Sequence, residues 1–88
     1  MAEGREGHVE AVGFAGLQIE ELENMLLAAR EKQEECLGLV ITAVGEQPST
    51  DSGTNAMESV AGMSDRLTEL IGMCENAKAE MNRYGSGF

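Results

Sequence analysis

Apolar side chains recur at alternating steps of three and four residues along the first half of the chain. One polar residue, Gln33, interrupts the series Val12, Ala15, Ile19, Leu22, Leu26, Ala29, Gln33, Cys36, Val40 and Ala43. Such spacing places the series on one face of an α-helix. We therefore predict a helix over about 9–44, with fraying before residue 9 because glycines such as Gly4 and Gly7 weaken a helix.

The second half of the chain repeats this pattern without a polar interruption. The series is Ala56, Val60, Met63, Leu67, Leu70, Cys74, Ala77, Met81, Tyr84 and Phe88. It predicts a second helix over about 55–84. Gly85 and Gly87 follow Tyr84 directly, so we expect the helix to end there and to leave a short C-terminal tail.

The segment between the two series, about 45–54, is rich in Gly, Pro, Ser, Thr and Asp, the residue types that form turns. Two long helices joined by one short loop predict an all-α fold, an antiparallel two-helix hairpin that forms a single domain over 1–88. Facing residue numbers should then add to about 100. Leu26 would face Cys74, and Cys36 would lie too far from Cys74 for a disulfide. We expect both cysteines to be small buried apolar residues in a reducing compartment.

The apolar surface is wider than one hairpin can bury, most clearly near the loop. Leu37, Ile41, Val44 and Met57 lie outside the predicted contact between the helices. These four residues are our sequence-based candidates for partner binding. Two occupants remain open: a second copy, which would give a coiled-coil-like dimer in the form of a four-helix bundle, or a different helical protein.

Composition supports association and argues against nucleic-acid binding. Six Lys or Arg against sixteen Asp or Glu give a formal charge of −10, which would repel a phosphate backbone. With 88 residues and no Trp, the chain has little bulk for a core, so we expect it to gain stability from another chain.

No pattern in the sequence points to chemistry. The single histidine, His8, is distant from Cys36, and the carboxylates lack metal-ligand spacing. We expect no enzyme activity, no catalytic residue, no metal and no cofactor. No apolar stretch approaches the length of a membrane span, and the first residues do not form a signal peptide. We therefore expect the chain to be cytoplasmic before any export that needs no signal peptide, with secretion or virion association left open.

The chain combines two predicted helices and an acidic charge with a C-terminal region that contains Leu67, Leu70, Ala77 and Tyr84. In these features it is similar to the W-x-G family. These small bacterial helical-hairpin proteins are substrates and partner proteins of type VII secretion, and short actinobacterial helical-hairpin proteins are also similar. The resemblance implies a hairpin fold and a role in secretion. Asp51-Ser52-Gly53 stands where the family has Trp-x-Gly, and Phe88 stands where its export signal has Asp or Glu. The alternatives are a structural or decoration component of a larger assembly, such as a phage virion, and a small acidic adaptor or inhibitor.

Overall fold

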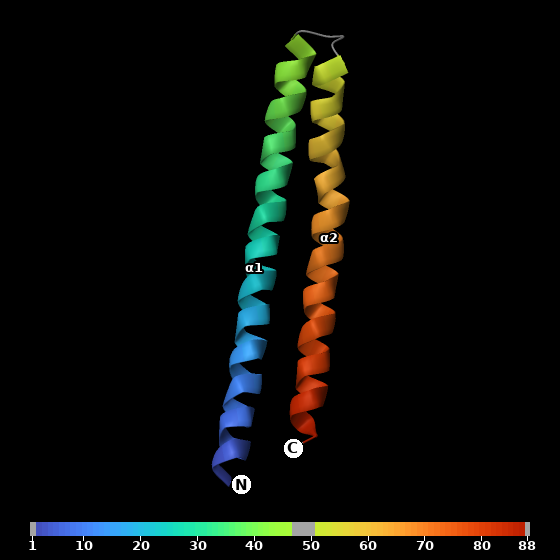
Figure 1. The fold of residues 1–88 in the computed structure, drawn as a ribbon. Coiled ribbons are helices and arrows are strands. Elements are labelled where there is room, and N and C mark those ends of the chain that lie inside the picture. The colour runs from blue at the N-terminus through green and yellow to red at the C-terminus, as the bar shows by residue number, and fades with distance from the viewer. Residues whose placement is uncertain (1, 47–50, 88) are drawn as a thin grey trace.

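The computed structural model describes residues 2–46 and 51–87, and within them the fold is two helices without a strand. α1 spans Ala2–Glu46 and α2 spans Asp51–Ser86. The helices run antiparallel and side by side, with the start of α1 and the end of α2 at the same end (Figure 1). The molecule measures 68 × 15 × 14 Å. The predicted all-α hairpin is confirmed.

Both helices are longer than the sequence predicts. α1 begins at Ala2 rather than near residue 9 and ends at Glu46 rather than 44. α2 begins at Asp51, whose charge suits the positive N-terminal end of a helix, rather than near residue 55, and it ends at Ser86. The prediction overstated the effect of glycines: each weakens a helix by about 1 kcal/mol at most, whereas a proline would stop it. Of the predicted loop, residues 47–50 lie outside the described part.

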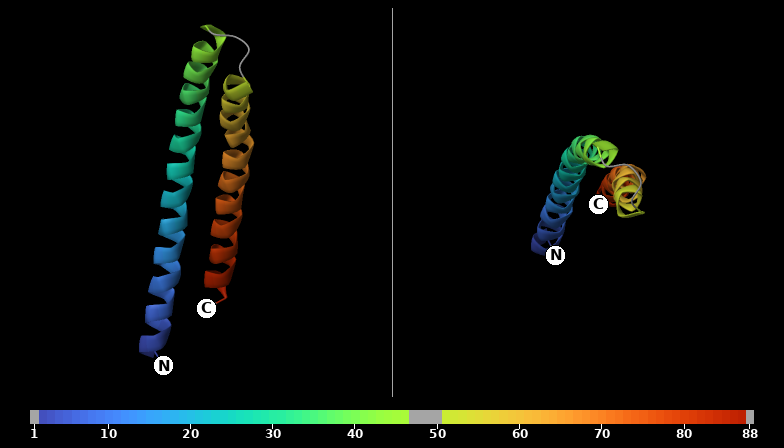
Figure 2. Two further views of the ribbon diagram at one scale, coloured as in Figure 1. Left: turned by 45° about the horizontal axis from the view of Figure 1, so that its top comes forward. Right: turned by 90° about the horizontal axis from the view of Figure 1, so that it is seen from above.

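Contacts along the hairpin follow the predicted register, in which facing residue numbers add to about 100. The Glu23 carboxylate meets the Lys78 ammonium, and Arg30 Nη1 donates to Thr68 Oγ1 at 3.5 Å. Leu26 and Cys74 line the same groove. The two helices therefore remain side by side along their length, as a second view also shows (Figure 2).

The contact between the helices is rotated from the predicted one by one residue at eight of the predicted positions. The predicted contact residues that are instead exposed are Leu22, Ala29, Cys36 and Ala43 on α1 and Ala56, Met63, Leu70 and Tyr84 on α2. The residue that follows each is buried or half-buried: Glu23, Arg30, Leu37, Val44, Met57, Ser64, Ile71 and Gly85. The other described positions of the two series are buried or half-buried, and Phe88 lies outside the described part. The apolar stripe is wider than the contact, and the hairpin buries only one edge of it.

The buried part of the hairpin is small. Among the described residues, only Ile71 and Cys74 are buried apolar side chains, and Glu23 and Gln33 are buried polar ones. Apolar burial is the main favourable contribution to folding, so this hairpin has little of it to offset conformational entropy. Much of the apolar surface remains on the outside.

Candidate partner-binding face

The exposed edge of the apolar stripe carries two shallow grooves, and we call this side of the hairpin the groove face. The first groove, of about 380 Å³, is lined by Ile19, Leu22, Leu26, Leu70, Met73, Cys74 and Ala77. The second, of about 400 Å³, is lined by Ala29, Lys32, Gln33, Cys36, Met63, Arg66 and Leu67. In both grooves α1 and α2 supply opposite walls. The second groove lies nearer the loop along both helices, so the two form one track.

The chemistry of the groove face differs from that of the rest of the chain. The first groove is lined by hydrocarbon and sulfur, and the second is bordered by two cations, Lys32 and Arg66. None of the Asp and Glu side chains that the structure describes lines either groove. The groove walls thus expose apolar atoms to water without a described carboxylate beside them, which is the character of an interaction site.

The four sequence-predicted partner residues lie elsewhere. Leu37, Val44 and Met57 are half-buried in the hairpin. Ile41 is exposed. None of the four lines either groove. Most of the groove residues belong to the two apolar series of the sequence. The predicted contact, however, placed Leu22, Cys36 and Leu70 between the helices.

The cysteines differ from each other in burial. Cys74 is buried, whereas Cys36 is exposed on the wall of the second groove, so the expectation that both are buried is wrong for Cys36. Neither forms a disulfide.

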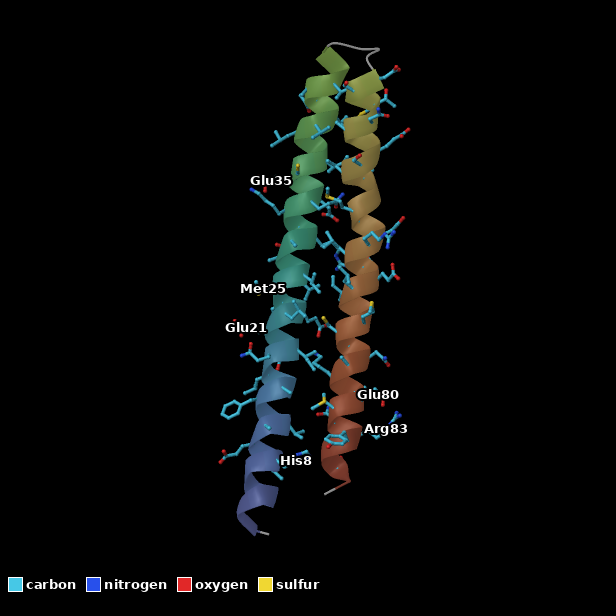
Figure 3. All side chains as sticks on the ribbon, in the orientation of Figure 1. His8, Glu21, Met25, Glu35, Glu80 and Arg83 are labelled. Carbon is cyan, nitrogen blue, oxygen red and sulfur yellow. The ribbon has the colours of Figure 1, made fainter. Side chains whose placement is uncertain are left out.

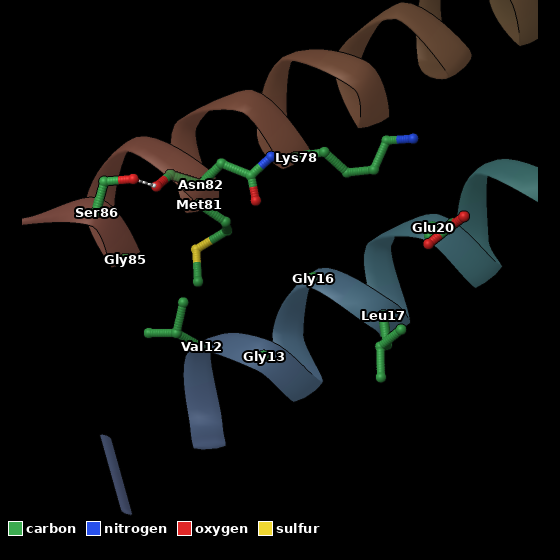
Figure 4. Close-up of a pocket in the computed structure, with 10 residues that line it drawn as sticks. All are labelled: Val12, Gly13, Gly16, Leu17, Glu20, Lys78, Met81, Asn82, Gly85 and Ser86. Carbon is green, nitrogen blue, oxygen red and sulfur yellow. Dashed lines mark hydrogen bonds between the residues drawn. The ribbon is translucent and has the colours of Figure 1, made fainter. Parts of the chain in front are cut away.

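A third hollow, of about 540 Å³, lies near the chain ends, and its wall is more polar. Its lining includes Gly13, Glu20, Lys78 and Asn82, and the side chains of Val12 and Met81 approach each other between the helices (Figure 4). Gly13 and Gly16 have no side chain to fill the space. Gly85 of α2 lies close to Val12 of α1, because an added Cβ at Gly85 would lie 3.0 Å from Val12 Cγ1. The hollow lies where these glycines supply no side chain.

An ion pair between a buried carboxylate and a half-buried ammonium joins the helices at the edge of this hollow. Lys78 Nζ lies 2.6 Å from Glu23 Oε1, and Glu23 is buried. The hydrogen bond to Glu23 raises the pKa of Lys78 above its usual 10.5, partial desolvation opposes this, and the charges of Glu23, Glu20 and Glu75 add to the increase. A cation and an anion held in this way stabilise the pairing of the helices.

Gln33, the polar interruption in the first series, is buried at the contact between the helices. Its Nε2 donates to the backbone oxygen of Val60 at 2.7 Å, whereas its buried Oε1 has no hydrogen-bond partner. The amide is therefore only half satisfied.

Replacing Gln33 with Leu is expected to raise the melting temperature. The variant loses one hydrogen bond, worth about 0.5–1.5 kcal/mol, but removes an unpaired buried oxygen that costs about 1–3 kcal/mol and adds apolar burial. Differential scanning calorimetry at equal protein concentration measures the change. A lower melting temperature with unchanged helicity would show that the bond to Val60 is worth more than these costs.

Within residues 2–46 and 51–87, no three or more His, Cys, Asp and Glu side chains gather closely enough to hold a metal ion. Neither described helix has a long enough apolar stretch to cross a membrane. Comparisons with protein-family models, with curated proteins and with solved structures found no match. The case for function therefore depends on the geometry of the groove face.

Proposed function

We propose that this protein is a non-enzymatic protein-interaction module whose groove face packs against the apolar face of other helices. One observation carries the proposal: a chain of charge −10 has an apolar track along both helices, and no carboxylate among the described side chains lines its two grooves. Two more helices laid on this track would complete a four-helix bundle. A second copy of the chain supplies such helices.

The energetics favour this association. Full burial of a Leu or Met side chain contributes about 1.5–3 kcal/mol, and the hairpin leaves several of them half or more exposed. The exposed side chains on or beside the grooves include Leu22, Met25, Met63, Leu70 and Met73. A bundle would cover them and supply the apolar burial that the isolated hairpin lacks. Methionine side chains are flexible, so they also pack well at such contacts.

Replacing Leu70 with Asp is expected to weaken self-association at least about tenfold. The change removes apolar burial from the first groove and places a charge at the contact. Because Leu70 is 43 % exposed in the hairpin, helicity should be retained. Sedimentation equilibrium gives the dissociation constant, and far-UV circular dichroism gives the helicity.

The matched control is Ile41→Asp, which introduces the same charge at a residue that is 51 % exposed and lines neither groove. We expect little change in the dissociation constant. If Ile41→Asp weakens association and Leu70→Asp does not, the binding surface is the loop-proximal one predicted from the sequence. If neither variant changes association, the proposal is wrong.

A role in type VII secretion, as in the W-x-G family, is a second candidate, and the hairpin of two long antiparallel helices supports it. A component of a virion or another large assembly would also use an apolar docking face. Neighbouring genes separate these roles: a secretion ATPase and toxin genes favour the first, and capsid and tail genes favour the second.

A further inference from the structure

Charged residues are unevenly placed along the groove face. Lys32 on α1 and Arg66 on α2 line the same groove, so they lie at the same level of the hairpin. Glu80 follows Arg66 by fourteen residues, and Met73 lies midway between them. Residues seven apart share one face of a helix, so Arg66, Met73 and Glu80 follow one line along α2. Glu80 lies toward the chain ends, and Met25 lies about midway along α1 (Figure 3).

Two copies can place their groove faces together in two symmetric ways. In the parallel arrangement, the chain ends of both hairpins lie at the same end of the dimer. α1 of each copy then faces α2 of the other copy at the same level. Lys32 of one copy then opposes Arg66 of the second copy, and the symmetry repeats this contact. Like charges that face each other oppose binding, so the charge pattern disfavours a parallel dimer.

If the hairpins point in opposite directions, α1 faces α1 and α2 faces α2. A two-fold axis through the level of Met25 and Met73 brings Met25 opposite Met25 of the second copy. It likewise brings Met73 opposite Met73 of the second copy. Arg66 and Glu80 lie seven residues on either side of Met73, so Arg66 opposes Glu80 of the second copy, twice in the dimer. Lys32 opposes the neutral Gln18. This arrangement replaces two repulsions with two attractions.

Side-chain size follows the same symmetry. With the axis at Met25 and Met73, large residues of the outer edge meet small ones of the second copy. The pairs are Leu22 with Ala29, Leu39 with Ala11, and Leu70 with Ala77. Large side chains opposite small ones interdigitate, which is how closely packed layers of a bundle form.

We propose that the groove face binds a second copy of this chain in antiparallel orientation, centred on Met25 and Met73. This inference rests on the proposed function and adds the identity of the partner and the orientation. Its main support is charge: the parallel arrangement brings Lys32 to Arg66, whereas the antiparallel one brings Arg66 to Glu80.

The variant Arg66→Glu distinguishes the two orientations by the sign of its effect. In the antiparallel dimer it creates two contacts between glutamates, so the dissociation constant should rise about fivefold. The double variant Arg66→Glu/Glu80→Arg restores opposite charges and the wild-type net charge, and it should return the constant to near the wild-type value. In a parallel dimer, Arg66→Glu would instead strengthen association, because it would oppose Lys32.

Disulfide formation gives an independent test in a Cys36→Ser background. Met25→Cys should form a covalent dimer in air, because residue 25 faces residue 25 of the second copy. A non-reducing gel detects this dimer. Leu39→Cys is the control: it lies on the same line of α1 and is exposed to a similar extent, 67 % against 63 % for Met25. In the antiparallel dimer residue 39 faces Ala11 of the second copy. From the α-helical rise per residue, the two copies of residue 39 are then about 42 Å apart, so Leu39→Cys should not cross-link.

The outcomes separate this inference from the proposed function. The antiparallel orientation is wrong if both cysteine variants cross-link equally or if Arg66→Glu associates more tightly. The proposed function would still hold in that case, provided that Leu70→Asp weakens the dimer. A wild-type chain that stays monomeric at high micromolar concentration would overturn the second copy as the partner. The expected result is fast cross-linking of Met25→Cys alone, with weakening and rescue at residues 66 and 80.

Discussion

Replacing Ile71 with Ala is expected to lower the free energy of unfolding by about 2–5 kcal/mol. Ile71 is one of two buried apolar side chains in the described residues, so its truncation leaves a cavity at the centre of a small core. Small domains are typically stable by only about 5–15 kcal/mol, and the loss would be a large part of that. Urea unfolding followed by circular dichroism at fixed protein concentration measures the effect.

Phe14→Ala is the control for Ile71→Ala. It removes a larger side chain, but Phe14 is 66 % exposed on α1 and lines neither groove, so we expect a change within about 0.5 kcal/mol. A comparable loss in both variants would contradict the placement of Ile71 in the core, because truncation would then cost the same wherever the side chain lies.

Replacing Lys78 with Met is expected to lower the melting temperature strongly, because the buried carboxylate of Glu23 loses the ammonium that lies 2.6 Å from it. A buried charge without a partner is much more costly than an exposed one. The control is Arg83→Met, which breaks an exposed pair with Glu80 and should have a small effect. Equal changes in the two variants would show that burial adds nothing to the Glu23–Lys78 pair.

The same ion pair predicts a dependence on alkaline pH. The pKa of Lys78 is raised on folding, so its contribution to stability is fully present below the usual value of 10.5 and is lost as pH rises through the folded-state pKa. A guanidinium remains charged in this range, so Lys78→Arg should keep more of its stability above pH 10.5 than the wild type. Melting curves between neutral and alkaline pH measure the difference, and parallel curves would contradict it.

Local patterns in the sequence were sufficient to predict two helices and their antiparallel register. The period of the apolar residues predicts a helix, and a single segment rich in Gly, Pro and Ser separates the two series. The ends of the helices were less accurate because glycines such as Gly4 and Gly7 weaken a helix without stopping it. The width of the apolar stripe also indicated a surface left over for a partner.

Only the tertiary structure decided which edge of that stripe is buried. A rotation of each helix by a fraction of a turn exchanges Leu22 for Glu23 or Leu70 for Ile71 at the contact, and the period of the pattern is the same in both arrangements. The two edges differ in contacts between residues distant in the sequence: the buried edge lets Glu23 meet Lys78, while Gln33 reaches the backbone of Val60. Such contacts depend on both helices at once, so the pattern of either helix alone could not locate the groove face.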